Sequence, residues 1–173
     1  MLAVVAVLLG LGFLVASFWW LYARRGRLVS TAPDTYATPP GPTMRLRFPL
    51  VLLNTGSLPL VVGDLRVIVS GAHEFHWASV RTKVSPSMDD FVDAATPFAV
   101  RPHDAVAIVA EFGQVPPEWR PEPGESYPVV IEAKDERGIW RPVVEFQWWA
   151  PNRVDLMAAT VAHRNASTGG PLL

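Results

Sequence analysis

The sequence contains no cysteine, which excludes disulfides, cysteine-ligated zinc or iron–sulfur centres, thiol catalysis and lipidation of a cysteine. It also lacks a P-loop, a dinucleotide-binding glycine motif and the G-x-S-x-G motif of serine hydrolases. Nothing else in the chain points to a reaction. We therefore expect a protein that is not an enzyme, with no catalytic residues, no cofactor and no metal.

Charge is absent from the first 23 residues, and no acidic residue occurs before Asp34. The first charged side chains are those of Arg24, Arg25 and Arg27. The chain has 15 basic and 16 acidic residues, so without these three arginines 12 basic residues face 16 acids, a balance of −4. A negatively charged body has no broad basic surface to bind the phosphates of a nucleic acid, so we expect no nucleic-acid partner.

The apolar run, residues 1–23, is long enough for a transmembrane helix. As a helix it would measure about 34 Å, against about 30 Å for the hydrocarbon core of a bilayer. A cleaved signal peptide would have a basic segment before the apolar run, and a buried core helix would have a polar face; neither is present. Aromatic and arginine side chains favour the end of such a helix. We predict a membrane interface at Trp19, Trp20, Tyr22, Arg24, Arg25 and Arg27.

Positive charge lies only on the C-terminal side of this helix. The positive-inside rule then predicts that the body is cytoplasmic and that the lipid bilayer is one of its partners. The alternative is an extracytoplasmic body, which basic residues upstream of Met1 would favour.

Residues 24–44 follow as a basic juxtamembrane segment and a linker. Four prolines fall within residues 30–43, which favours extended chain and predicts a spacer between the bilayer and the body. The folded domain is expected over residues 45–150. Residues 151–173 are predicted to form a partly disordered tail with one short helix, residues 154–163.

The body has the pattern of a β protein. Short apolar or alternating runs are separated by turn residues, and prolines within them oppose helix. We predict a bulge or bend at Gly63 and Asp64, and an antiparallel, immunoglobulin-like β-sandwich of about seven strands. The predicted strands are residues 45–53, 60–69, 74–82, 96–100, 105–112, 127–134 and 139–149.

Three stretches, residues 45–67, 96–113 and 127–146, together with the N-terminal helix carry a resemblance. They are similar to a group of uncharacterised single-pass membrane proteins with an Ig-like body from high-GC Gram-positive bacteria. The resemblance covers most of the chain and implies an architecture, because no activity and no site residues are known for that group.

Histidines and acids give weak signals for chemistry. His73 and His76 would face opposite sides of a strand and could not share a metal, so we interpret them as solvated loop histidines. The acidic stretch of Asp89, Asp90 and Asp93 lacks the ligand spacing of a calcium loop and predicts a solvated rim. His103 stands beside Asp104, but adjacency in sequence does not make a catalytic triad.

Tryptophan carries more information, because five of the seven tryptophans lie in the body: Trp77, Trp119, Trp140, Trp148 and Trp149. Adjacent residues of a strand point to opposite faces. Trp148 shares a face with Phe146, and Trp149 shares one with Gln147. We therefore predict that Trp148 is buried and that Trp149 lies near the surface as a candidate partner contact.

Two functions are consistent with these features. The first is a membrane-anchored, non-catalytic binding or scaffolding module that acts through contacts with another protein. The alternative is an extracytoplasmic ligand-binding module, for example for glycans, that uses an exposed tryptophan. The side of the membrane distinguishes the two.

Overall fold

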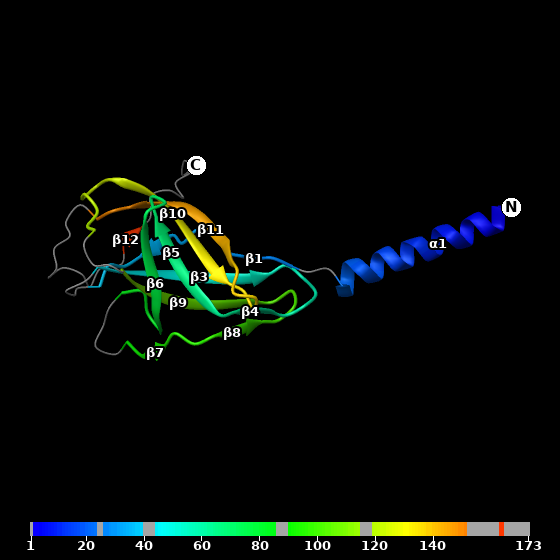
Figure 1. The fold of residues 1–173 in the computed structure, drawn as a ribbon, viewed down its shortest axis with the longest axis horizontal. Helices are drawn as coiled ribbons and strands as arrows, with labels where there is room; N and C mark the ends of the chain where they lie inside the picture. Colours follow the sequence, from blue (N-terminus) through cyan, green and yellow to red (C-terminus); the bar gives the residue numbers. More distant parts are fainter. Residues whose placement is uncertain are drawn as a thin grey trace.

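The computed structural model describes residues 2–23, 26–39, 44–85, 90–114, 119–151 and 163–164. A long N-terminal helix projects from one end of a β-rich body (Figure 1). Strands make up 51% of the chain, which confirms a mainly β protein with antiparallel pairing.

The helix consists of α1 (Leu2–Phe18) and a π-helical end, η1 (Trp19–Ala23). Its side chains are exposed on all sides, as expected for a run without a polar face. Within the described residues, Ala3–Leu21 is the one segment long and apolar enough to cross a membrane, with a mean hydropathy of 2.3. By length and composition the same segment also suits a signal sequence.

Each predicted run has a counterpart among the strands, but the predicted number of about seven is wrong. The run of residues 60–69 is divided into two strands, and four further strands of two or three residues occur at residues 28–29, 35–36, 92–94 and 163–164, which are too short to show a sequence alternation. The predicted bend at Gly63 is confirmed, because it separates two strands at that residue. The strands are β1 (Leu28–Val29), β2 (Thr35–Tyr36), β3 (Arg45–Asn54), β4 (Leu60–Val62), β5 (Asp64–Val69), β6 (His73–Arg81), β7 (Val92–Ala94), β8 (Phe98–Val100), β9 (Ala105–Gln114), β10 (Ser126–Lys134), β11 (Trp140–Trp149) and β12 (His163–Arg164).

One large sheet forms the wall of the body. Its strands follow the order β1-β3-β9-β6-β5-β10-β11, and β7 pairs with β6; the pairs β4–β8 and β2–β12 form two small sheets. The two ends of the large sheet meet, because the Ser30 amide beyond β1 donates a 3.1 Å hydrogen bond to the Val143 carbonyl of β11. The sheet is therefore a nearly closed barrel.

This arrangement does not confirm the immunoglobulin-like sandwich. A sandwich has two sheets that pack face to face, whereas here neighbouring strands are hydrogen-bonded from β1 round to β11. Strand lengths and alternation are common to sandwiches and barrels, so the sequence pattern did not distinguish between them.

The segment predicted as a spacer closes the barrel. Residues 30–39 are extended, as expected, but they lie in the seam between β3 and β11. Ala37 exchanges two backbone hydrogen bonds with Arg47 of β3 (2.8 and 3.1 Å), and the Tyr36 hydroxyl donates a hydrogen bond to the Trp149 carbonyl of β11. Tyr36 and Ala37 are fully buried. The described part of this segment is thus a component of the fold rather than a free linker.

The core lies inside the barrel and is rich in aromatic rings. Trp148 is fully buried and contacts Tyr36 edge-on, with ring centroids 5.7 Å apart. Phe48 packs edge-on against Phe146 at 5.4 Å. Burial raises the pKa of the Tyr36 hydroxyl to about 12, and the Trp148 side chain opposes part of this increase. The predicted inward position of Trp148 is confirmed.

Most of the predicted tail lies outside the described residues, and so does most of the predicted helix over residues 154–163. Its last residue, His163, belongs to β12, which pairs with β2 next to the seam.

Candidate contact surface on the outer face of β3 and β9

The outer face of β3 and β9 is bare and apolar over the half nearest the helix. Directly paired residues of antiparallel strands share a face, and here Val51 pairs with Ala107, Leu53 with Ala105, and Val29 with Leu53. The exposed fractions are 48% for Val51, 41% for Leu53 and 37% for Val29, and both alanines are exposed. We call these five residues the apolar strip.

Alternation along β3 explains the strip. Leu50 and Leu52 point into the barrel and are fully buried, so their neighbours must point out. The apolar run of residues 48–53 therefore covers both faces of the strand. A strand that bears one solvated face ordinarily alternates with polar residues, and this half of β3 does not.

The other half of the same outer face carries a cluster of charges, which we call the ion cluster. Glu111 accepts hydrogen bonds from Arg47 Nε (2.5 Å), Arg45 Nη1 (2.9 Å) and Arg81 Nη2 (3.0 Å). Arg47 also donates from Nη1 to Asp90 Oδ2 at 2.7 Å. Residues two apart in a strand share a face, and the pairs Arg47–Glu111, Pro49–Val109 and Val51–Ala107 follow one another at this spacing. The ion cluster therefore lies on the same face as the apolar strip.

The ion cluster is buried although it lies outside the barrel. Glu111 is inaccessible and Arg47 is 4% exposed, and Asp90, two residues before β7, lies against Arg47. Burial by itself would raise the pKa of Glu111, but hydrogen bonds and charge from Arg47 and Arg81 outweigh it and lower that pKa. Both carboxylates therefore stay charged, and the cluster joins the chain before β7 to the sheet.

Asp90 corrects the expectation of a solvated acidic rim. Its side chain is 3% exposed, and it also accepts hydrogen bonds from the hydroxyl and amide of Thr82. Burial would raise the pKa of Asp90, but the charge of Arg47 and these hydrogen bonds lower it. Asp93 is exposed, as predicted. Asp89 lies outside the described residues.

Trp149 lies at the surface, as predicted. It is 43% exposed, and the other four tryptophans of the body, all described, are buried or half-buried. On the same outer face, Gln147 bonds to the Ser126 hydroxyl at 3.0 Å. This end of β11 therefore presents one indole with polar neighbours.

His73 and His76 contact different neighbours and do not form a shared site. His73 and His76 both belong to β6, so they are strand residues and not loop residues. The His73 ring stacks on Trp119 with centroids 4.3 Å apart, whereas His76 is exposed beside Glu74. Within the described part of the chain, no group of three or more metal-ligating side chains occurs.

His103 and Asp104 form a turn and are not paired with each other by any described contact. His103 has a φ of 53°, a left-handed conformation that suits a tight turn. Asp104 Oδ1 accepts a 2.8 Å hydrogen bond from the amide of Ala105, the first residue of β9. Their role in the described contacts is structural.

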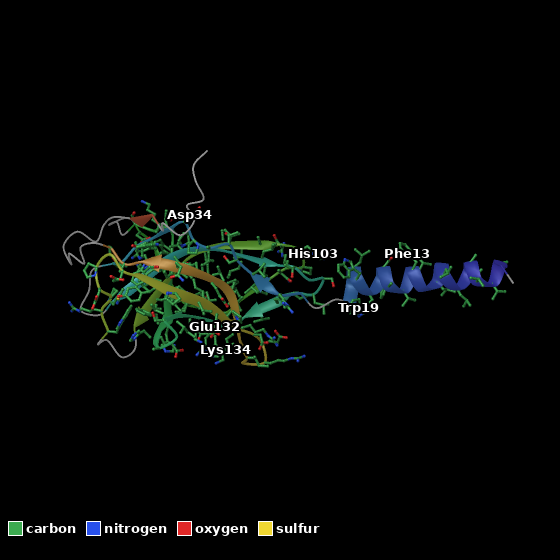
Figure 2. The ribbon with its side chains drawn as sticks, turned by 90° about the horizontal axis from the view of Figure 1, so that it is seen from above. Phe13, Trp19, Asp34, His103, Glu132 and Lys134 are labelled. Carbon is green, nitrogen blue, oxygen red and sulfur yellow. The ribbon has the colours of Figure 1, made fainter. Side chains whose placement is uncertain are left out.

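Two of the predicted membrane-interface residues, Trp19 and Trp20, lie in η1, the end of the helix that approaches the body. Trp19 and Trp20 are 57% and 58% exposed. Figure 2 shows Trp19 at the body-side end of the helix, and His103 on the end of the barrel that faces it. Arg24, Arg25 and the side chain of Tyr22 lie outside the part that the structure describes.

Sequence reasoning missed both the ion cluster and the strip, although each left a signal. Glu111 is the one charge in a strand that otherwise reads as buried, "AVAIVAEF". A charge in such a run needs a partner, and Arg45 and Arg47 alternate with apolar residues at the start of β3. The continuous run from Phe48 to Leu53 was a signal that both faces of β3 are apolar.

No protein-family model matches the chain, and a search of curated proteins gives no significant match.

Proposed function

We propose that this chain is a membrane-anchored, non-catalytic scaffolding module that binds another protein through the apolar strip. The observation that supports the proposal is the exposure of Val29, Val51 and Leu53 in register on one sheet face, with small alanines beside them. Adjacent apolar side chains left in water are typical of contact surfaces, whereas single exposed ones are not.

The shape of the strip suits a flat apolar partner. Alanine at positions 105 and 107 leaves no bulk beside Val51 and Leu53, so a partner can approach the sheet closely. Burial of apolar surface would contribute about 25 cal/mol for each Å² removed from water, and the lack of charged groups in the strip means that no ion is desolvated. We expect a partner with its own apolar face close to the membrane.

The anchor and its orientation belong to the same proposal. In it α1 is an uncleaved single-pass span and the body is cytoplasmic, because Arg24, Arg25 and Arg27 follow the helix. A cysteine at Asp34, an exposed position, would be the only thiol of the protein. In intact cells it should resist an impermeant thiol reagent; ready labelling would place the body outside.

The strip can be tested by crosslinking in cells. A photoreactive residue at Val51 should give a specific adduct with a partner protein, and Leu53→Glu should abolish that adduct. The matched control is a photoreactive residue at Glu145, which is also exposed, on the outer face of β11. The same adducts from both positions, or an adduct that survives Leu53→Glu, would rule out the strip as the binding surface.

Trp149 supports the second candidate, a ligand-binding module for glycans on the outside of the membrane. An exposed indole beside Gln147 and Ser126 offers one stacking face and hydrogen-bonding groups. This proposal requires an extracytoplasmic body. Retention on a glycan array that is lost in Trp149→Ala and kept in Leu53→Glu would favour it over the scaffolding proposal.

The group of bacterial single-pass proteins that the sequence resembles belongs with these proposals. That likeness supports the anchored architecture, while the surface that acts is inferred from the residues above.

A further inference from the structure

We propose that the end of the barrel nearest the helix is a rigid platform that docks on the surface of an anionic lipid bilayer. The platform consists of the turns of residues 54–59 and 101–104. This inference rests on α1 as an uncleaved span, and it is separate from the partner surface on the strip.

The connection between helix and barrel is too short to act as a spacer. The helix ends at Ala23, and Gly26 already packs against the barrel. Three peptide steps join these two residues, so their Cα atoms are at most about 11 Å apart. If α1 spans the bilayer, the first turns of the barrel lie within the headgroup region or directly above it.

The chain is held firmly at this point. A Cβ atom at Gly26 would lie 2.1 Å from the Gly56 amide nitrogen, so only glycine fits against that turn. Arg27 and Thr55 then form three hydrogen bonds. The Arg27 amide donates to the Thr55 hydroxyl at 3.0 Å, and the Thr55 hydroxyl and amide each donate to the Arg27 carbonyl at 3.1 Å. Motion of the helix end is therefore transmitted to the turn of residues 54–59.

The two turns of the platform are one rigid unit. The side chain of Asn54 is fully buried and donates to the carbonyls of Leu58 (2.8 Å) and Val100 (3.1 Å). The His103 amide donates to the Gly56 carbonyl at 3.1 Å, and the Asn54 amide donates to the Asp104 carbonyl at 3.0 Å. Neither turn can move toward or away from the membrane without the other.

The surface of the platform combines apolar and basic side chains with one exposed acid, Asp104. Leu58 is 42% exposed, and Pro59 and Pro102 are exposed beside it. Arg27 and Arg101 are exposed at the same end, and in the sequence Arg27 follows closely after Arg24 and Arg25. Apolar tips with basic neighbours are the chemistry that enters an interface of anionic headgroups. Figure 2 shows that Asp34 lies farther from the helix than His103.

A single fluorophore can measure the docking in the full chain. Because the protein has no cysteine, Leu58→Cys would carry the only label when the chain is reconstituted into nanodiscs that contain phosphatidylserine. We expect a blue-shifted emission at position 58 and strong quenching by headgroup-proximal nitroxide lipids. The matched controls, Asp34→Cys and Val51→Cys, should show neither.

Two variants separate docking from simple proximity. Insertion of about 20 Gly/Ser residues after Arg24 lengthens the tether to a reach of roughly 25 Å, so that proximity alone no longer holds the platform at the surface. Quenching at position 58 should persist in anionic discs and fall in phosphatidylcholine discs. Arg101→Glu should reduce it in the lengthened chain.

Several results would overturn the inference. Quenching at position 58 that disappears with the long tether in both lipids would show that the platform has no affinity for the surface. Equal quenching at Asp34 and Leu58 would contradict end-on docking. Strong quenching at Val51 with none at Leu58 would show that the strip faces lipid, which would refute the proposed function as well. Loss of the crosslink at Val51 without change at Leu58 would refute the proposed function alone.

Discussion

The outer face of β3 and β9 contains two regions of opposite character. In the half far from the helix, charged groups are buried: Glu111 and Arg47 are almost inaccessible and hydrogen-bonded to each other. In the half near the helix, apolar groups are exposed: Val51 and Leu53 face solvent in register with small alanines. The strands, the pairing and the pleat are the same in both halves.

What differs is the cover. In the charged half Asp90 lies against Arg47 from outside the sheet, and the apolar half has no described cover. This chain buries Arg47 together with Glu111 and Asp90 outside its own barrel, so it has the means to cover a surface. That no described residue covers the apolar half, at the end near α1, is the reason to propose a partner there. The predictions below test this contrast, from the largest expected effect to the smallest.

The largest loss of stability is expected for a substitution in the core. Trp148→Ala should lower the free energy of unfolding by about 3–5 kcal/mol, because it removes a fully buried ring that contacts Tyr36. Trp149→Ala should cost much less, since that ring is 43% exposed. Chemical denaturation of the full chain in detergent, followed by circular dichroism, measures both. If Trp149→Ala is less stable than Trp148→Ala, the face of β11 that carries Trp149 is not the solvated one.

Glu111→Ala tests whether the charged half supports the fold. It leaves Arg47 and Arg81 without their shared acceptor, and loss of one member of a buried ion pair costs about 3–5 kcal/mol. We expect the lower end of this range, because Asp90 still pairs with Arg47. The control is Glu145→Ala, an exposed acid on β11, which should change the same denaturation midpoint little. Equal midpoints for the two variants would show that the ion cluster is not needed for stability.

Acid should weaken the charged half selectively. The folded-state pKa values of Glu111 and Asp90 lie below their ordinary values of 4.5 and 3.8, so their contribution is complete above the ordinary values. It is lost as the pH falls through the lowered values, because the unfolded chain then binds more protons. Melting temperatures below about pH 5 should therefore fall. In Glu111→Gln this fall should be shallower; an identical slope would assign the acid sensitivity to other carboxylates.

The apolar half should tolerate change. Val51→Thr keeps a β-branched side chain in the strand and removes only exposed apolar surface, so the free energy of unfolding should change by less than about 0.5 kcal/mol. Its neighbour provides the contrast, because Leu52→Ala in the core should cost about 2–5 kcal/mol. Denaturation of both variants measures this, and Val51→Thr should still weaken the crosslinked complex. A large cost at Val51 would indicate that the strip is covered within the chain.

The sequence by itself determined the features that depend on local periodicity. An uncharged run of 23 residues is an apolar helix wherever the body lies, and strand alternation placed Trp148 inside and Trp149 outside, because adjacent side chains of a strand cannot share a face. The bend at Gly63 followed from the residue itself. Only the tertiary structure decided that the sheet closes on itself, that Tyr36 of the expected linker fills the seam, and that Asp90 and Glu111 meet Arg47. Those outcomes depend on which distant strands pair, and the period of two within each strand is the same in a sandwich and in a barrel.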